Sequence, residues 1–205
     1  VNGKPAVIGQ KISATDDVVT YMGKLVEKND KKYYLMLNKP KGYVATLSDE
    51  KGRRCVADLV KDIKTRVYPI GRLDYNSEGV LLMTNDGELT NKLTHPRHEI
   101  PKIYEVDVVG KVTTEQLTVL NRSMTIDGYI LLPVKTEFLS KNEKFTTLRM
   151  TLYEGRNRQI RKMCEQVGLK VAKLTRVAIG GITLDSLSSG KWRYLTKEEI
   201  SMLKK

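Results

Sequence analysis

The stretch that decides the fold is a loop followed by an apolar strand: Gly71-Arg72-Leu73-Asp74-Tyr75-Asn76-Ser77-Glu78-Gly79, then Val80-Leu81-Leu82-Met83-Thr84. A run this apolar is stable as a strand only when both of its faces are buried. The loop before it is therefore held rigidly, and rigid loops at strand ends often carry reactive side chains. Asp74 is the best candidate nucleophile or base, although an Asp near a turn more often caps backbone N–H groups. Arg72 is either a functional cation or a surface partner of Asp74.

The charge balance points to a nucleic-acid partner. The 205-residue chain carries 36 Lys and Arg against 24 Asp and Glu, a net charge of +12. Such an excess attracts polyanions, although a solvated basic surface gives the same count. The sequence shows no long apolar span, signal peptide or lipidation motif, so we expect a cytoplasmic protein without a membrane partner.

Familiar cofactor and metal motifs are missing from the sequence. Cys55 and Cys164 stand far apart, and His95 and His98 flank a turn, so we expect no metal site and no disulfide framework. We find no P-loop and no Rossmann glycine motif, and expect no nucleotide cofactor. A catalyst built on this chain would use carboxylate, phenol and guanidinium groups. Since no apolar heptad is visible, we expect a monomer.

The order of the predicted elements favours an α+β fold with a largely antiparallel sheet. Residues 1–28 hold short strand fragments, 29–32 form the predicted linker, and 33–205 form the main domain. In that domain, alternation and apolar runs predict strands at 33–37, 80–83, 103–109, 145–152 and 171–179. Helices are predicted at 56–60, after a cap at Asp86, and at 113–120, 157–167 and 197–203.

Basic residues gather around one predicted helix start, at Arg156, Arg158, Arg161, Lys162, Lys170, Lys173 and Arg176. Cations at a helix N-terminus make a phosphate-binding surface, whereas a generic run of this kind is more often a solvated helix face. Arg161 differs because it borders the apolar stripe through Ile160 and Cys164. A half-buried guanidinium needs a partner, and Asp74 would supply one.

Lys102-Ile103-Tyr104 opens an alternating strand. An aromatic residue in such a strand is usually part of the core, but in an RNA-binding protein it can stack on a base.

Together these motifs resemble the RsuA/RluB family of ribosomal RNA pseudouridine synthases. The resemblance runs from about residue 33 to the end. It is carried by Leu35-x-Leu37-Asn38-Lys39-Pro40, Gly71-Arg72-Leu73-Asp74 with Gly79, Thr84-Asn85-Asp86-Gly87-Glu88-Leu89, His95-Pro96, Lys102-x-Tyr104, Glu154-Gly155-Arg156-Asn157-Arg158-Gln159-Ile160-Arg161, and Leu174-x-Arg176. The resemblance implies a pseudouridine synthase fold in two subdomains with a central RNA-binding cleft. It also implies that residues 1–28 are the closing strands of an S4 RNA-binding domain whose helical front half is absent.

The resemblance implies a role for each matched residue. Asp74 would act at the ribose of the target uridine, Tyr104 would pack against the flipped base, and Arg161 would pair with Asp74. Leu152 or Leu174 would close the pocket beneath the base. The remaining matches would face RNA: Arg72, Lys102, Arg156, Arg158, Gln159, Lys162 and Arg176.

The implied activity is isomerisation of a specific uridine in ribosomal RNA, without a cofactor, and we favour the large-subunit branch. Modification of small-subunit RNA and a non-catalytic RNA-binding or ribosome-assembly role on the same scaffold remain alternatives. A metal-dependent nuclease using Asp74 and Asp86 is disfavoured because Asp86 suits a helix cap.

Overall fold

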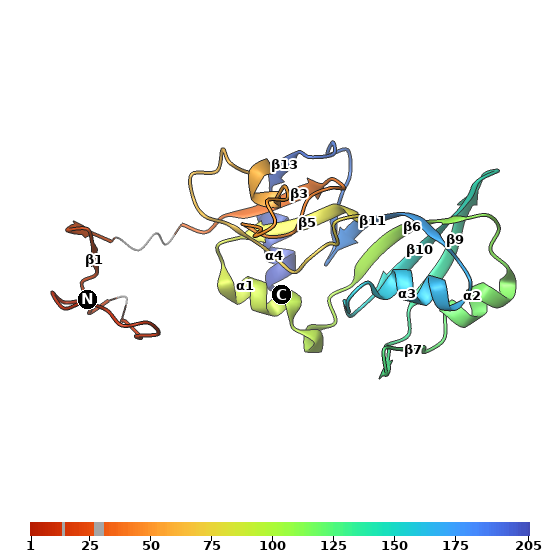
Figure 1. Cartoon of the computed structure of the whole chain (residues 1–205), viewed down its shortest axis with the longest axis horizontal. Helices are drawn as coiled ribbons and strands as arrows, with labels where there is room; N and C mark the ends of the chain where they lie inside the picture. Colours follow the sequence, from red (N-terminus) through yellow and green to blue (C-terminus); the bar gives the residue numbers. More distant parts are fainter. Residues whose placement is uncertain (14, 27–30) are drawn as a thin grey trace. The chain divides into compact units, whose positions relative to one another are not determined.

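A computed structural model of the chain describes residues 1–13, 15–26 and 31–205. These residues divide into two compact units, Val1–Lys32 and Tyr33–Lys205 (Figure 1). In the first unit, β1 (Thr20–Tyr21) pairs with β2 (Lys24–Leu25) across a tight turn. The assignment of this unit to an S4 domain stays a prediction, and the predicted linker at 29–32 lies partly outside the described residues.

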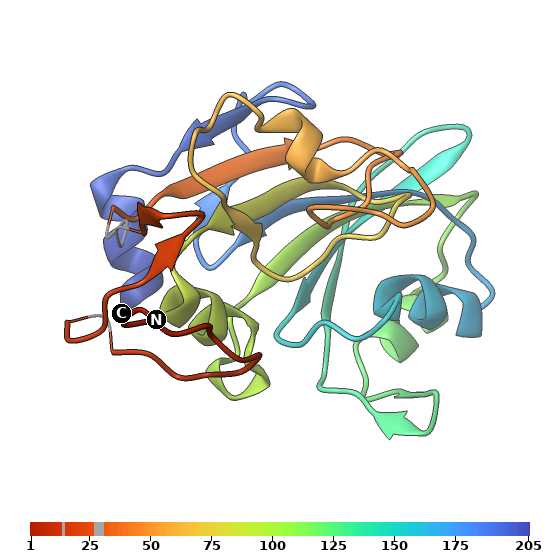
Figure 2. The same cartoon turned by 60° about the vertical axis from the view of Figure 1, so that its left-hand side comes forward.

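The second unit is built on a nine-stranded sheet in the order β13-β3-β5-β11-β6-β10-β9, with β4 paired to β5 and β12 to β11 (Figures 1 and 2). Its strands are β3 (Tyr34–Lys39), β4 (Tyr68–Pro69), β5 (Glu78–Thr84), β6 (Lys102–Val109), β9 (Lys135–Lys141), β10 (Phe145–Leu152), β11 (Val171–Ile179), β12 (Ile182–Thr183) and β13 (Trp192–Tyr194). All of these pairings are antiparallel except that of β5 with β11. The predicted α+β fold is confirmed.

Short helices and one small hairpin complete the unit. They are η1 (Val56–Leu59), α1 (Gly87–Thr94), η2 (Pro96–His98), α2 (Thr114–Leu120), the hairpin β7 (Thr125–Ile126) and β8 (Tyr129–Ile130), α3 (Gln159–Gln166) and α4 (Lys197–Lys204). Asp86 caps α1 as predicted, since its carboxylate accepts from the Leu89 N–H at 3.4 Å. Within the described ranges, no helix is long and apolar enough to span a bilayer.

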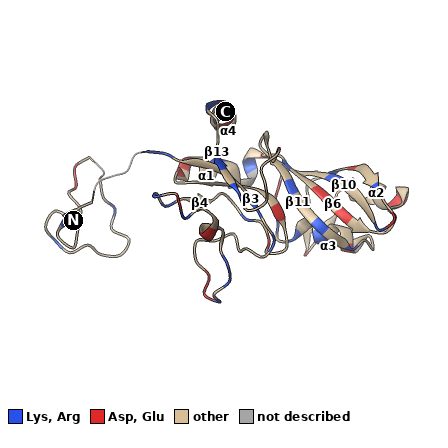
Figure 3. Ribbon diagram, turned by 90° about the horizontal axis from the view of Figure 1, so that it is seen from above, with Lys and Arg blue, Asp and Glu red and all other residues tan. Residues whose placement is uncertain are grey.

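The two faces of β5 pack against different elements because its side chains alternate. Val80 and Leu82 share an apolar cluster with Leu89 and Leu93 of α1 and with Leu203 of α4. Leu81 and Met83 belong to the cluster that holds η1, the inner face of β6 and the apolar side of α3. Seen from above, α4 and α3 accordingly lie on opposite sides of the sheet (Figure 3). Burial of both faces explains why β5 reads as a continuous apolar run.

The two halves of the sheet meet at one short parallel pairing, where Thr175 aligns with Glu78 and Arg176 with Gly79. Gly79 has φ +105, and a Cβ atom there would lie 2.2 Å from the backbone oxygen of Arg176. Only glycine lets the two backbones approach this closely. Side chains reinforce the joint, because Glu78 forms an ion pair with Lys173 at 2.8 Å and accepts from the Thr175 hydroxyl at 3.1 Å.

The strands predicted at 145–152 and 171–179 are confirmed as β10 and β11, and the one at 103–109 begins one residue earlier, at Lys102. The helix predicted from residue 157 begins at Gln159, because Arg158 adopts the left-handed conformation, φ 52 and ψ 28. The helix predicted at 56–60 is the 3-10 turn η1.

Gly79→Ala should destabilise the protein by more than about 2 kcal/mol, because the new Cβ atom strains a positive φ and collides with backbone that cannot yield. Chemical denaturation followed by circular dichroism measures this loss. Gly87→Ala is the matched control, since a Cβ atom at this first residue of α1 would meet nothing within 4 Å. Equal stability of the two variants would contradict the close approach of β5 and β11.

Candidate active site

A cavity of about 350 Å³ opens where the two halves of the sheet diverge. Part of its lining is the segment from Ile70 to Asp74, with Ser77 and the end of α1. Another part is formed by the start of β6, the end of β10 and the segment from Tyr153 to Ile160. Leu152 and Leu174 both line it and are both buried. Eight predicted site residues meet here: Arg72, Asp74, Lys102, Tyr104, Arg156, Arg158, Gln159 and Arg176.

Asp74 stands at the wall of this cavity with its side chain 33% exposed. A carboxylate oxygen lies 3.8 Å from a guanidinium nitrogen of Arg158. The backbone turns directly after it, since the Ser77 N–H donates to the Asp74 carbonyl at 3.0 Å. The carboxylate thus lies at the cavity on a hydrogen-bonded turn. This agrees with the rigid loop that the sequence predicts before the buried apolar strand.

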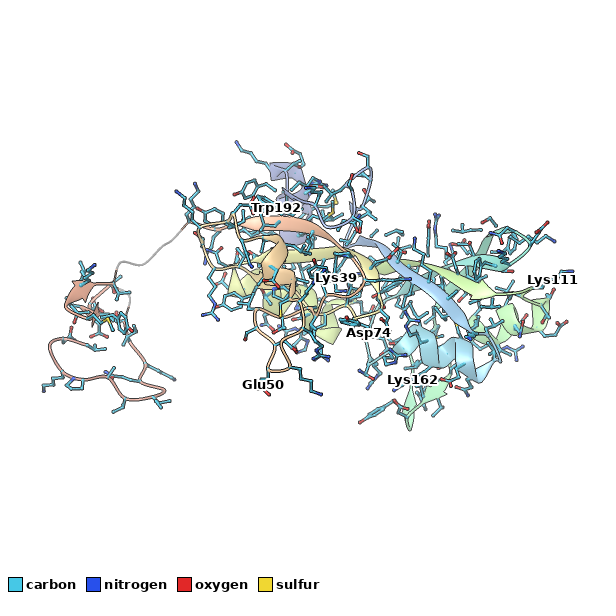
Figure 4. The ribbon with its side chains drawn as sticks, turned by 45° about the horizontal axis from the view of Figure 1, so that its top comes forward. Lys39, Glu50, Asp74, Lys111, Lys162 and Trp192 are labelled. Atoms are coloured by element: carbon cyan, nitrogen blue, oxygen red, sulfur yellow. The ribbon has the colours of Figure 1, made fainter. Side chains whose placement is uncertain are left out.

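Lys39 holds the backbone of the loop that carries Asp74, a role that no sequence pattern indicates. Its side chain is fully buried at the end of β3, and Nζ donates to the backbone oxygens of Ser77 at 2.8 Å, Asp74 at 3.1 Å and Pro40 at 3.1 Å (Figure 4). An ammonium group has three donors, so these three carbonyls use all of them. Burial lowers the pKa of Lys39 to about 8, and the carboxylates of Asp74 and Glu78 oppose that shift.

The predicted ion pair between Asp74 and Arg161 is wrong in its partner. Within the described part of the chain, Asp74 forms its ion pair with Arg158. Arg161 lies behind the loop, where its Nη2 donates to the backbone oxygen of Asn76 at 3.0 Å. Burial and the charge of Arg158 lower the pKa of Arg161, while the charge of Asp74 opposes the shift. Arg161 therefore acts on the loop and on the local field, and its catalytic role stays a prediction.

Tyr104 and Arg176 form the inner end of the cavity. Tyr104 on β6 is 9% exposed, and its hydroxyl accepts from Nη1 of Arg176 at 3.4 Å. Arg176 is itself only 3% exposed, with Nε donating to the Val80 carbonyl at 2.8 Å. Arg176 nevertheless lines the cavity, so its predicted contact with RNA stays a prediction. The neighbouring β-strands enclose its guanidinium, so it supports Tyr104 from within the sheet.

Two other residues predicted to face RNA are engaged within the protein. Gln159 is 3% exposed; its Oε1 accepts from the Arg156 N–H at 3.1 Å and its Nε2 donates to Glu154 at 3.2 Å. Lys162 forms an ion pair with Asp127 on the β7–β8 hairpin. Gln159 thus holds the segment around Arg156 in place, and Lys162 connects α3 to the hairpin. Glu154, which sequence reasoning missed, receives bonds from Gln159, Arg156 and the Leu132 N–H.

The remaining predicted cations stay at the cavity rim. Arg72 is exposed on the loop that carries Asp74, and the side chains of Arg156 and Arg158 are 45% and 49% exposed. Lys102 is half-buried, donates to the Ile100 carbonyl at 3.0 Å, and has its pKa lowered by burial and by Arg176. Lys and Arg also recur along α3 and β11 (Figure 3). The cavity thus has a positive rim and two carboxylates in its lining, Asp74 and Glu154.

Asp86 lies outside this cavity. Its carboxylate caps α1, accepts from the Tyr34 hydroxyl at 2.7 Å and lies 3.6 Å from Nζ of Lys204. The geometry therefore argues against a nuclease site shared by Asp74 and Asp86.

Known proteins share this fold and these motifs. The family described as RNA pseudouridylate synthase matches residues 33–166. The chain is 41% identical over 207 residues to the ribosomal large subunit pseudouridine synthase B of Bacillus subtilis (strain 168), covering 100% of this chain and 84% of that protein. An uncharacterized RNA pseudouridine synthase of Aquifex aeolicus (strain VF5) is 40% identical over 205 residues, covering 99% and 82%. A solved structure, described as the crystal structure of pseudouridylate synthase, superposes with a TM-score of 0.80 at 29% identity, covering 98% of this chain and 86% of that one.

The chain therefore belongs to the RNA pseudouridylate synthase family and is an RNA pseudouridine synthase. The resemblance derived from the sequence motifs is confirmed at this level.

Lys39→Met should lower the free energy of unfolding by roughly 1–3 kcal/mol at pH 7, because buried carbonyls lose their donors. Lys41→Met, at an exposed lysine two residues away, is the control. The pH dependence follows from the pKa of Lys39, which is about 8 in the folded chain against 10.5 for an unperturbed lysine. Between these values the unfolded chain binds more protons, so wild type gains stability relative to Lys39→Met as pH rises, with no change below pH 8. Denaturation curves from pH 7 to 10 measure the difference in free energy of unfolding between wild type and Lys39→Met. A difference that does not change with pH would contradict the burial of Lys39.

Proposed function

We propose that this pseudouridine synthase isomerises a uridine of ribosomal RNA, and specifically of the large ribosomal subunit. Two observations support this substrate: the Bacillus subtilis relative is named a ribosomal large subunit pseudouridine synthase, and this chain has a net charge of +12. A polyanion as long as ribosomal RNA is attracted by such a charge, and the rim cations around the cavity give it contacts for its phosphates.

The observation that carries the proposed mechanism is the position of Asp74. Its carboxylate stands at the cavity wall, ion-paired with Arg158 and fixed at its backbone by Lys39. We assign to it the action at the ribose of a uridine that has left its helix. Flipping a base costs a few kcal/mol, which stacking and phosphate contacts offset. Arg72, on the same loop, is placed to follow the departing base into the RNA helix.

The reaction needs only groups that this cavity contains. The bond between uracil N1 and ribose C1′ breaks, the base turns, and C5 bonds to C1′. C5 then loses its proton and N1 gains one, so neither an oxidant nor an energy source is consumed. We assign Tyr104 to packing against the freed base, with its hydroxyl available to help remove the C5 proton. Arg161 holds the Asp74 loop through Asn76, and Arg156, Arg158 and Lys102 receive the RNA backbone.

Asp74→Asn should abolish tritium release from ribosomal RNA transcripts labelled with 5-tritiated uridine, because the amide is not an effective nucleophile or base. Binding of the transcript, measured by filter retention, should stay within a few-fold of wild type, since the phosphate contacts remain. Asp185→Asn is the matched control, at a surface aspartate outside the cavity lining. Strong, salt-dependent RNA binding by a wild type that releases no tritium would favour a non-catalytic RNA-binding factor.

Cells lacking the gene should lose one or a few pseudouridines from large-subunit ribosomal RNA and none from the small subunit. Chemical mapping of pseudouridine at single-nucleotide resolution measures this. Complementation with wild type should restore the site, and Asp74→Asn should not. Loss of a small-subunit site instead would overturn the large-subunit assignment while leaving the enzyme class intact.

A further inference from the structure

The β7–β8 hairpin projects away from the sheet beside α3 in both cartoon views (Figures 1 and 2). Thr125 pairs with Ile130 and Ile126 with Tyr129, and the chain turns through Asp127 and Gly128 at φ 51 and φ 78. Two positive φ values in succession are typical of a tight hairpin turn that matches strand twist. An isolated two-stranded hairpin is marginal in water, so contacts outside it must hold this one in place.

Those contacts attach the hairpin to the wall of the active-site cavity. Asp127 at the turn forms an ion pair with Lys162 of α3. At the hairpin's base, the Leu131 N–H donates to the Met124 carbonyl at 2.8 Å. The following residue, Leu132, donates its N–H to the carboxylate of Glu154 at 3.0 Å. Because Glu154 lines the cavity, the hairpin and the cavity rim form one connected element.

The hairpin exposes two large side chains, Tyr129 at 56% and Ile130 at 77%. The guanidinium carbon of Arg156 lies 4.2 Å from the centroid of the Tyr129 ring. This cation–π contact orients the ring and covers one of its faces. Arg156 also lines the cavity, so the ring contacts a residue of the cavity rim.

We propose that Tyr129 is a stacking platform for a base of the RNA strand that flanks the target uridine. The inference rests on the proposed function, because it concerns the substrate of the same site. An aromatic ring beside a backbone-tracking cation is the combination that binds single-stranded nucleic acid. The platform holds the strand next to the flipped nucleotide, and it acts in binding rather than in the chemical steps.

The local charge favours RNA over a protein partner. The carboxylate of Asp127 is matched by Lys162, and that of Glu154 is bonded to Arg156 and Gln159. Arg158, 49% exposed, is the further cation on this side, and its contact with Asp74 is a loose 3.8 Å, so Asp127 and Glu154 leave no unmatched negative charge beside the ring. A base above the ring would place its phosphates near these guanidinium groups.

Steady-state kinetics on naked large-subunit ribosomal RNA transcripts test the proposal. Tyr129→Ala should raise KM about tenfold with kcat within about twofold of wild type, as expected for the loss of one stacked base. Tyr129→Phe keeps the ring and should stay near wild type. Tyr194→Ala, at a 52% exposed tyrosine on β13 outside the cavity lining, is the control. An unchanged KM in Tyr129→Ala would overturn the proposal, and so would an equal rise in KM for Tyr194→Ala.

Crosslinking separates failure of this inference from failure of the proposed function, because it does not depend on turnover. Transcripts containing 4-thiouridine are irradiated with the full chain and the protein is digested with trypsin. The peptide Ser123–Lys135 contains Tyr129 and should carry RNA in wild type and in Asp74→Asn, but at least tenfold less in Tyr129→Ala. Absence of RNA on this peptide overturns the inference even if the enzyme is active. A KM effect seen with ribosomal particles but not with naked transcripts also overturns it, because the partner would then be a protein.

Discussion

The structure depends on the close approach of two backbones at Gly79 and Arg176. This parallel pairing joins the half of the sheet that carries β3 and β5 to the half that carries β6, β10 and β11. It also decides where the site can be. The Asp74 loop enters β5 just before Gly79, and the side chain of Arg176 reaches back to Val80 and across to Tyr104. A side chain at position 79 would separate the two strands, and the carboxylate and the phenol would no longer face one cavity.

The cations around Asp74 have different tasks, and burial assigns them. Lys39 is fully buried and donates to backbone carbonyls. It holds the loop without competing for the carboxylate. Arg161 likewise donates to a backbone oxygen. Arg158 is half exposed and is the ion-pair partner of Asp74. An ion pair this close to the surface contributes little to stability, so Arg158, unlike Lys39, is not needed to hold the loop in place.

The sequence predicts the elements of this site better than the contacts between them. Alternation in 145–152 and apolar content in 171–179 identify β10 and β11, because the hydrophobic pattern of neighbouring residues reflects which of them are buried. The pairing of Asp74 with Arg158 depends instead on one backbone angle. Arg158 adopts φ 52 and therefore lies outside the helix. The apolar stripe of the helix favours Arg161 as the partner of Asp74, because that pattern describes only residues within the helix. Lys39 is 35 residues from Asp74, and no local pattern reports a contact at that separation.

The same reasoning limits what the net charge says about RNA binding. A count of basic residues around α3 treats them alike, yet Lys162 is paired with Asp127 and Arg176 is enclosed by the sheet. Both are engaged within the protein, so a count of basic residues overstates the charge that is presented to solvent. The outward charge near the cavity is concentrated on the loop at Arg72 and on the segment that carries Arg156 and Arg158. Both segments line the cavity that also contains Asp74, so the exposed positive charge is gathered around that carboxylate. The distribution of exposed charge, rather than its total, therefore indicates where on this protein a polyanion would be attracted.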